Sequence, residues 1–404
     1  MAEDNRGDVT DSYDVIVVGG RVAGASTALL LARAGHRVVV VDRVRFPADT
    51  LSTHLIWPAG MIHLQRWGLL EEVAGTGAPA LRTIRNDIDG SAIEMPVWPE
   101  SGVSELYAPR RTVLDPTILR AAELAGADVL EGATVDGLAR DAAGHVTGVV
   151  GHRDDGHPLH IGARVVVGAD GWRSRVAREA GAVAYDRRAR SNAVHYAYWS
   201  GLDDRGVELW YRTDGLMAGV FPTNDGACVY VNCHTNRSPE LRRDVDVNYL
   251  RLMDEAAPDL AARLTTASRM SPVRGTPGLK GFVHRPYGPG WLLVGDAGCT
   301  ADPASAHGIA AALRDAELAA MAIDVGLREP EAADRACQEF HATRDRSLPL
   351  YELGWAMASY EWDAIEMIRL QASFVAELVR EAQESAALPA WAGVPAPARG
   401  SVAT

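Results

Sequence analysis

The chain has 404 residues and a formal net charge of −13. A single hydrophobic core stops growing at roughly 250–300 residues, so this length predicts two or three subdomains. The excess of acidic residues disfavours nucleic acid as a partner. Residues 1–12 are polar and acidic, and no run approaches the roughly 20 apolar residues that span a bilayer, so we expect a cytoplasmic protein with neither a secretion signal nor a membrane span.

The cysteines are scattered along the chain and show no metal-ligand spacing, so we predict no metal site. In the reducing cytoplasm they stay as thiols. They are Cys228, Cys233, Cys299 and Cys337.

Residues Asp14–Arg43 predict a strand, a glycine turn, a helix and a second strand. Val15–Val18 and Val38–Val41 are runs of β-branched residues suited to a parallel sheet that is buried on both faces. Ala23–Ala34 between them is rich in helix formers and small residues. The segment therefore predicts a βαβ unit.

The turn Gly19–Gly24 has the first and third glycines of the dinucleotide-binding fingerprint, with Arg21 in place of the second. Free N–H groups at the helix start would face a pyrophosphate. Asp42 ends the second strand, where it could accept hydrogen bonds from a ribose diol and would repel a 2′-phosphate, which favours FAD or NAD over NADP. Arg21 either widens the loop or contacts a phosphate itself. The alternative is a glycine-rich turn in an ordinary α/β domain.

A loop and mixed elements follow this unit. Phe46–Pro58 is predicted to be a loop centred on Ser52, Thr53 and His54, and Ala59–Val73 a helix. Gly75–Pro79 reads as a turn, and residues 81–107 as short strands.

Asp115 is predicted to cap a helix that starts at Pro116 and ends at Gly126. Asp128–Leu130 then begins a strand, and Gly137–Gly162 suggests a meander of three strands.

Residues 183–273 alternate apolar and polar positions and predict an antiparallel domain that covers a substrate, interrupted by a helix over Val247–Leu264. The aromatic residues and the histidine singled out on its strands are His195, Tyr196, Tyr198, Trp199, Trp210, Tyr211, Phe221 and Tyr230.

The chain then returns to the first domain. Trp291–Val294 predicts a buried strand and Gly308–Ala320 an amphipathic helix. Residues 331–385 suggest two further helices, and the tail from Leu388 is rich in alanine and proline and is predicted to be disordered.

Three motifs in this order carry a resemblance to a known family: GGRVAG at residues 19–24, GADGWRSR at 168–175 and GDAGCTADPASAHGI at 295–309. Together they resemble the FAD-dependent monooxygenase superfamily of the para-hydroxybenzoate hydroxylase type, which is related to geranylgeranyl reductases and flavin-dependent halogenases. The resemblance implies an α/β fold, with a Rossmann-like FAD-binding domain, an inserted antiparallel β-rich substrate domain and C-terminal helices. The expected ranges are 13–80, 108–182 and 275–340 for the FAD-binding domain, 81–107 and 183–274 for the substrate domain, and 341–386 for the helices, with disordered ends at 1–12 and 387–404.

The resemblance also assigns residues to the cofactor. Residues 19–24 would hold the FAD pyrophosphate, Arg111 would reach the phosphates and ribityl chain, Val135 would meet the adenine, and Asp170 with Gly171 would serve both FAD and nicotinamide. The complete set is Gly19, Gly20, Val22, Ala23, Gly24, Asp42, Arg43, Arg111, Val135, Asp170, Gly171, Asp296, Pro303, Gly308 and Ile309.

Two of these assignments, Asp296 and Gly308, also agree with general rules of ligand binding in α/β proteins. The carboxyl end of a strand in an open α/β sheet is where ligands bind, and Asp296 stands there to accept a ribityl hydroxyl. The helix that begins at Gly308 would point its N-terminus at the flavin and stabilise the negative charge of the reduced form. The alternative for Asp296 is a cap of a helix or turn.

The resemblance implies a monooxygenase that oxygenates a small aromatic or polycyclic metabolite through a flavin C4a-hydroperoxide, shielded from water by the aromatic domain. Its partners would be the small-molecule substrate and dioxygen. Electrons would come from NAD(P)H or from reduced flavin supplied by a separate flavin reductase.

Other reactions remain open. An FAD-dependent reductase of the geranylgeranyl reductase type would need a proton donor or base near the flavin, for which His54 and His307 are the candidates. A packing role is the alternative for both histidines. His195 and Tyr211 could line the substrate side, but ordinary sheet packing is favoured for them. A halogenase is disfavoured because Lys280, the only lysine, lies just before the third motif and the halogenase tryptophan block is absent. A flavin-binding sensor would bind FAD without oxidising NAD(P)H.

Overall fold

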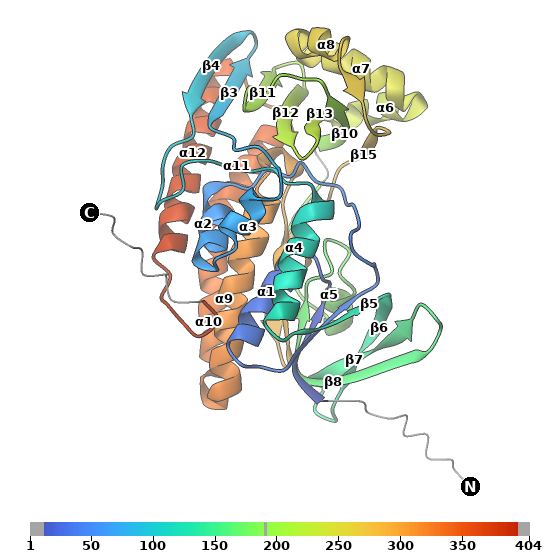
Figure 1. Ribbon diagram of the computed structural model, residues 1–404, viewed down its shortest axis with the longest axis vertical. Helices are drawn as coiled ribbons and strands as arrows, with labels where there is room; N and C mark the ends of the chain where they lie inside the picture. The colour runs from blue at the N-terminus through green and yellow to red at the C-terminus, as the bar shows by residue number, and fades with distance from the viewer. Residues whose placement is uncertain (1–11, 190–191, 395–404) are drawn as a thin grey trace.

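A computed structural model describes residues 12–189 and 192–394 (Figure 1). A mostly parallel sheet with its helices forms the lower half in this view, and an antiparallel sheet lies above it, capped by α6, α7 and α8. The long helix α12 (Ala364–Ala386) runs along one side and contacts both α2 (Pro58–Arg66) below and β3 (Thr83–Ile88) above.

The lower sheet has the order β17-β18-β8-β1-β2-β5, with β6 and β7 added beside β8 as an antiparallel extension. From β18 to β5 the neighbouring strands run parallel. The strands are β1 (Ser12–Val18), β2 (Val38–Asp42), β5 (Asp128–Glu131), β6 (Ala133–Arg140), β7 (Val146–Arg153), β8 (Pro158–Gly168), β17 (Tyr287–Gly288) and β18 (Trp291–Leu293).

Both faces of this sheet are buried, which explains its β-branched runs. Val15 and Val17 pack on the side of α1 (Val22–Arg33), α4 (Arg111–Leu124) and α9 (Gly308–Arg328). Ile16 and Val18 pack on the opposite side, with α5 (Arg175–Ala180) and the β6–β7 ribbon. Val15 pairs with Val38, so the predicted βαβ unit is confirmed.

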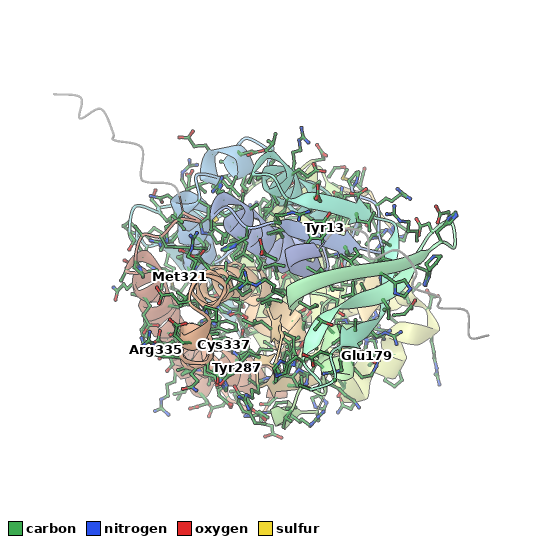
Figure 2. The ribbon with its side chains drawn as sticks, turned by 90° about the horizontal axis from the view of Figure 1, so that it is seen from below. Tyr13, Glu179, Tyr287, Met321, Arg335 and Cys337 are labelled. Atoms are coloured by element: carbon green, nitrogen blue, oxygen red, sulfur yellow. The ribbon has the colours of Figure 1, made fainter. Side chains whose placement is uncertain are left out.

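Seen from below, the β7–β8 ribbon projects beyond the body of the molecule (Figure 2). Tyr13 is labelled near its base. The Tyr13 hydroxyl donates to Asp128 at 2.9 Å, and the guanidinium of Arg37 lies 5.4 Å from the centre of its ring. These contacts tie β1 to the edge strand β5.

The upper sheet has the order β14-β10-β13-β12-β11-β3-β4, and β15 also pairs with β10. The pairing of β11 with β3 is parallel, and it joins two segments of the chain into one sheet. Its other strands are β4 (Ser91–Pro96), β10 (Asn192–Ser200), β11 (Val207–Arg212), β12 (Leu216–Thr223), β13 (Gly226–His234), β14 (Ser268–Arg269) and β15 (Arg274–Thr276).

The two faces of this sheet have different partners. Trp199 and Trp210 point to α6 (Ser238–Arg243), α7 (Val245–Ala256) and α8 (Pro258–Leu264), which close a small core of their own. The alternate residues, among them Tyr198 and Tyr230, point towards the main core. This alternation is the pattern of a sheet buried on both sides.

The remaining elements connect these layers. They are α3 (Leu70–Ala74), β9 (Ala184–Arg188), η1 (Thr235–Arg237), β16 (Gly281–His284), η2 (Gly295–Ala297), β19 (Cys299–Thr300), η3 (Pro303–Ser305), η4 (Pro330–Ala332), α10 (Ala333–Asp345) and α11 (Leu348–Ser359). Among the helices of the described part of the chain, none combines the length and apolarity needed to cross a bilayer.

Several predicted boundaries were wrong. The predicted helix 59–73 is two helices, because Gly68 has a φ of 73° and breaks the turn between α2 and α3. The predicted helix 247–264 is likewise divided between α7 and α8, where Ala257 leaves the helical region just before Pro258. Residues 331–385 hold three helices, α10, α11 and α12, rather than two.

The predicted cap at Asp115 was also wrong. Helix α4 begins at Arg111, and Pro116 lies inside it. Asp115 is fully buried and accepts hydrogen bonds from the side chains of Arg21 and Arg111, so it serves as the acceptor for two arginines.

The C-terminal segment is ordered further than its composition suggests. Leu388, Trp391 and Val394 pack against the main core. Residues 1–11 and 395–404 of the predicted disordered ends lie outside the described residues.

Candidate active site

The glycine turn between β1 and α1 is closed by backbone contacts. Gly19 has a φ of 107°, and a Cβ there would lie 2.4 Å from the carbonyl oxygen of Ala169. A Cβ on Gly24 would lie 1.8 Å from the carbonyl oxygen of Gly19. Both positions therefore require glycine, and the first N–H groups of α1 remain available to an anion.

Asp42 and Arg21 shape the turn from outside. The Asp42 carboxylate accepts hydrogen bonds from the N–H groups of Gly20 at 2.6 Å and Val44 at 2.8 Å. The Arg21 guanidinium donates to Asp115 at 2.6 Å and to carbonyl oxygens of the loop after β2. Arg21 is thus held by protein acceptors outside the turn, which explains how the turn accommodates a side chain at the second fingerprint position.

Asp296 and Gly308 mark the wall of a cleft. Both residues are exposed, although their neighbours Gly295, Ala297, His307 and Ile309 are buried. The protein that surrounds Asp296 desolvates its carboxylate and raises its pKa to about 6, while Arg111 opposes this shift. A side chain that water can reach, but whose carboxylate is largely surrounded by protein, lies in a recess of the surface.

The residues of this cleft fit an FAD molecule. No atom lies within 4 Å of the place where a Cβ on Gly308 would stand, so α9 presents an uncovered N-terminus there. A helix N-terminus favours the negative charge of a reduced flavin. Arg111 on α4 lies close enough to Asp296 to lower its pKa, so two of the residues expected to contact FAD lie near each other.

The other predicted contacts lie at varied places around the cleft. Asp170 caps α5, because it accepts hydrogen bonds from the Ser174 hydroxyl at 2.5 Å and the N–H groups of Arg175 and Val176. Val135 is buried in β6 at an irregularity of the strand, and Arg43 is exposed directly after Asp42. Predicted positions not placed above are at the start of α1 (Val22, Ala23), after β8 (Gly171) and in η3 (Pro303).

His54 lies between the cleft and the upper sheet. It has a φ of 71°, is 1% exposed, and its Nε2 lies 2.6 Å from the Tyr198 hydroxyl. Its Nδ1 has no partner, and Arg110 stacks 3.9 Å over the Tyr198 ring. Burial, together with Arg111 and Arg110, lowers the pKa of His54 to about 3, so its imidazole is neutral at neutral pH.

His307 faces away from the cleft, towards the C-terminal helices. Its Nε2 lies 2.6 Å from the Glu381 carboxylate, which also accepts hydrogen bonds from Arg314 and Ser347 at 2.6 Å each. Although burial opposes the shift, His307 and Arg314 hold the pKa of Glu381 well below its usual range. This network fastens the start of α9 to α12.

A cavity opens below the upper sheet. The space in it that is open to the centre of a water molecule is about 50 Å³, which is more than a single water needs. Its walls come from β3, β4, β11, β12, β13, η3, α11 and α12, and from the segments before α2 and after β4. The lining residues are Leu55, Trp57, Ile84, Asn86, Met95, Trp98, Leu209, Tyr211, Phe221, Tyr230, Ala304, Ser305, Ala306, Met357, Gln371, Phe374 and Val375.

Sequence reasoning foresaw only part of this cavity. The aromatic strands were expected to cover a substrate. For Tyr211, sheet packing was favoured over a place on the substrate side, and Tyr211 lines the space. Trp57, Gln371 and Phe374 were not singled out, because no local pattern distinguishes a helix residue that faces a cavity from one that faces the core. His195 is buried in β10 and does not line the cavity, in agreement with the packing role expected of it.

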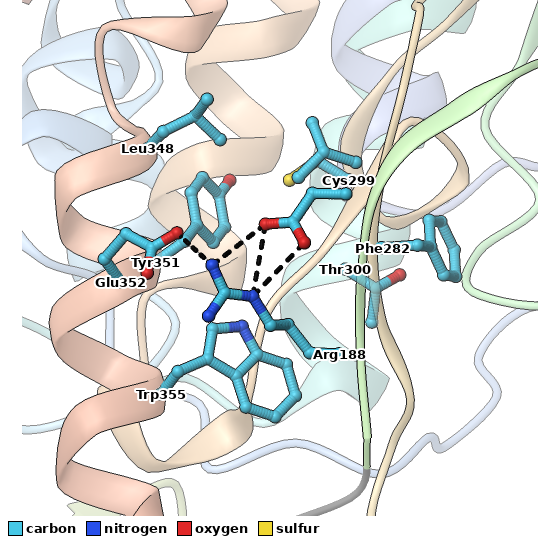
Figure 3. Close-up of a pocket in the computed structure, with 10 residues that line it drawn as sticks. Arg188, Phe282, Cys299, Thr300, Leu348, Tyr351, Glu352 and Trp355 are labelled. Carbon is cyan, nitrogen blue, oxygen red and sulfur yellow. Dashed lines mark hydrogen bonds and ion pairs between the residues drawn. The ribbon is translucent and has the colours of Figure 1, made fainter.

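A second, smaller cavity lies between the β9–β16–β19 sheet and α11 (Figure 3). Arg188 bridges Asp186 and Glu352 across it, and Trp355 lies beside the guanidinium. The space open to the centre of a water molecule is about 10 Å³, which is room for a single water. We assign it no ligand.

Known proteins with similar sequences include a reductase and a monooxygenase. Residues 12–347 match the FAD binding domain family. The chain is 30% identical over 326 residues to menaquinone reductase of Mycolicibacterium smegmatis, covering 76% of this chain and 75% of that protein. It is 29% identical over 342 residues to 6-methylpretetramide 4-monooxygenase of Streptomyces rimosus, covering 82% and 80%.

Solved structures agree on the fold. The flavin-dependent brominase Bmp2 superimposes with a TM-score of 0.76 at 19% identity, covering 93% of this chain and 94% of that one. At this identity the likeness concerns the fold alone. The family match spans most of the chain and includes all three motifs, so this chain belongs to the FAD-binding domain family and is an FAD-dependent oxidoreductase.

Proposed function

We propose that the protein is an FAD-dependent monooxygenase that inserts one oxygen atom of dioxygen into a small aromatic or polycyclic metabolite. Bound FAD, once reduced by NAD(P)H or replaced by reduced flavin from a partner reductase, would supply the electrons that activate dioxygen. The overall balance is substrate, dioxygen, NAD(P)H and a proton giving hydroxylated substrate, water and NAD(P)+.

The observation that carries this proposal is the chemistry of the cavity lining. It holds aromatic and aliphatic side chains, amides and hydroxyls, with no carboxyl, imidazole or ammonium group among the lining residues. Burial raises the pKa values of Tyr211 and Tyr230. Neither tyrosine is therefore a ready proton donor, and a dry apolar space favours a reaction that must exclude water.

The chain's own residues have distinct roles in this proposal. The turn at Gly19–Gly24 and the start of α1 would hold the pyrophosphate, and Asp296 would accept a ribityl hydroxyl. His54 would orient Tyr198 at the boundary of the two spaces, as a neutral hydrogen-bonding group. His307 would position the start of α9 through Glu381.

Turnover with isotopically labelled dioxygen tests the proposal. The purified FAD-loaded protein is incubated with an electron donor and a panel of phenolic polycycles, and the products are analysed by mass spectrometry. A product heavier by one labelled oxygen atom supports a monooxygenase. Donor oxidation that yields products with two added hydrogen atoms and no label would contradict it.

A reductase is the second candidate, favoured by the sequence relation to menaquinone reductase. It would move a hydride to a carbon–carbon double bond and needs a proton for the second carbon. In this case His54 would have to take a proton from the Tyr198 hydroxyl and pass it to the second carbon of the substrate. The same labelling experiment, repeated without oxygen, separates the two, because only a reductase turns over under anaerobic conditions.

A further inference from the structure

Three buried polar atoms without a protein partner meet the cavity below the upper sheet. They are the side-chain oxygen of Asn86, the indole nitrogen of Trp98 and the side-chain nitrogen of Gln371. Ile84 and Asn86 alternate with Arg85 along β3, so both of them face the cavity while Arg85 stacks on Trp210 behind the sheet.

An unpaired buried polar group destabilises a protein. One such atom in a cavity lining is common, but here three residues that line one cavity each carry one: Asn86 on β3, Trp98 in the segment after β4 and Gln371 on α12. These three residues form the polar group of the cavity. The Trp57 indole nitrogen, by contrast, has a partner in the protein, because it donates to the Ser305 carbonyl oxygen at 2.9 Å.

The donor chemistry limits what can pair with this group. An indole nitrogen only donates, whereas an amide can present its oxygen or its nitrogen after a half-turn of the side chain. A ligand that satisfies Trp98 must therefore offer an acceptor, and Gln371 can donate to the same atom. Asn86 can form a further hydrogen bond to the ligand, as an acceptor through its amide oxygen or as a donor through its amide nitrogen.

The position of the group relative to the flavin matters as well. Ala304, Ser305 and Ala306 line the cavity and lead directly into Gly308, so η3 forms the wall next to the cofactor cleft. The polar group is carried by other walls, β3 and α12.

On the basis of the proposed function, we propose that Trp98, Gln371 and Asn86 recognise a carbonyl oxygen of the substrate, on a part of the molecule away from the carbon that reacts. The substrate class is thereby narrowed to ketones and quinones with a flat polycyclic frame. The aromatic side chains of the lining would pack against the polycyclic rings of the substrate. The polar group would determine which edge of the substrate faces the flavin.

Equilibrium binding to the oxidised, FAD-loaded protein tests this inference without turnover. The probes are fluorenone and fluorene, which share a flat frame and differ in the carbonyl oxygen, and binding is followed by the flavin difference spectrum. Trp98→Phe keeps an aromatic ring and removes the donor. We expect this variant to bind fluorenone about fivefold to tenfold more weakly than the wild type, which corresponds to the loss of one hydrogen bond. Its affinity for fluorene should stay within about twofold of the wild-type value.

Gln371→Met is a second variant, with the same expectation, in case the first does not fold. Trp210→Phe is the matched control, because the Trp210 indole nitrogen also lacks a partner but lies in the core behind the sheet. It should change neither affinity. Equal losses for both probes in Trp98→Phe and Gln371→Met, or no loss for fluorenone, would overturn the inference.

The outcome is separate from that of the proposed function. If labelled oxygen fails to enter any product while the fluorenone preference depends on Trp98, the reaction assignment is wrong and the recognition group stands. If oxygen is incorporated and the preference is absent, the reverse holds.

Discussion

The cofactor cleft and the substrate cavity are built in opposite ways. In the cleft, the critical contacts are between backbone atoms, as at Gly24, where a single methyl group would collide with the Gly19 carbonyl oxygen. In the cavity, side chains from eight elements and from the segments between them contribute, and three of their polar atoms are left unpaired. The comparison teaches that the cleft specifies one ligand rigidly, whereas the cavity can change its specificity by single side-chain substitutions.

The two regions also differ in charge. Buried ion pairs surround the helix that lines the cleft: Glu381 holds His307 and Arg314, and Glu317 holds His63 and Arg66. Although burial opposes it, the last two residues hold the pKa of Glu317 at about 2. The cavity lining carries no charged residue. The networks fix the helix positions, whereas the cavity lining is neutral.

The largest effect is expected from Gly24→Ala, which tests whether the cleft is limited by backbone geometry. A Cβ 1.8 Å from the Gly19 carbonyl oxygen forces the turn open, so we expect loss of bound FAD and of most soluble protein. Flavin absorbance per protein measures this. Gly162→Ala is the control, since the nearest atom to its Cβ would be 3.9 Å away; equal FAD content in both variants would contradict the account.

Next in size is Glu381→Ala, which leaves Arg314 buried without its main partner. Removing one member of a buried ion pair destabilises by about 3–5 kcal/mol, and denaturant unfolding should show a loss of this order. The control is Glu384→Ala on the same helix, whose carboxylate pairs with Arg380 at the surface and is worth under about 1 kcal/mol. Similar losses in the two variants would mean that the buried network does not fasten α9.

Asp296→Asn tests the cleft without changing its shape. The folded-state pKa of Asp296, about 6, lies above its ordinary value, so the ionised carboxylate lowers the stability of the FAD-free protein. This cost is present above pH 6 and disappears as the pH falls to about 4. The variant should therefore be more stable than the wild type above pH 6, by on the order of 1 kcal/mol after solvent screening, and should bind FAD roughly tenfold more weakly.

Thermal unfolding of the FAD-free proteins across this pH range provides the measurement. A variant that is stabilised equally at pH 4 and pH 7, or that binds FAD normally, would remove Asp296 from the cofactor site.

A smaller effect is expected from His54→Asn, which lies between the two regions. Asparagine accepts the left-handed backbone of this position, and a neutral imidazole that only orients Tyr198 should contribute less than about tenfold to turnover. The pH–rate profile should also lack a step from His54, because its pKa is lowered to about 3. A loss above about a hundredfold would instead favour the reductase, in which His54 passes a proton.

The smallest effect is expected from Met95→Leu in the cavity wall. A volume-conserving change between apolar residues costs less than about 1.5 kcal/mol, and FAD content should be unchanged. Relative affinity for fluorene and larger polycycles should shift, which equilibrium titration would detect. An FAD loss comparable to that of Asp296→Asn would show that the two regions are not independent.

Prediction from the sequence succeeded where structure depends on neighbours along the chain. The βαβ unit followed from the valine runs, and the strand that delivers Asp296 followed from Trp291–Val294. It failed where a distant residue decided the outcome. Asp115 has the sequence context of a helix cap, but Arg21 and Arg111 draw it into the protein interior.

The sequence alone determined the βαβ turn, the order of the three motifs and thereby the family of this protein, because glycine requirements and strand periodicity are local properties of the backbone. Only the tertiary structure decided that His54 is buried and neutral, that His307 turns to Glu381, and that Trp98 and Gln371 face one cavity. Trp98 and Gln371 are 273 positions apart by their residue numbers, 371 − 98. Such contacts form when helices and sheets pack, and no local pattern of residues encodes them.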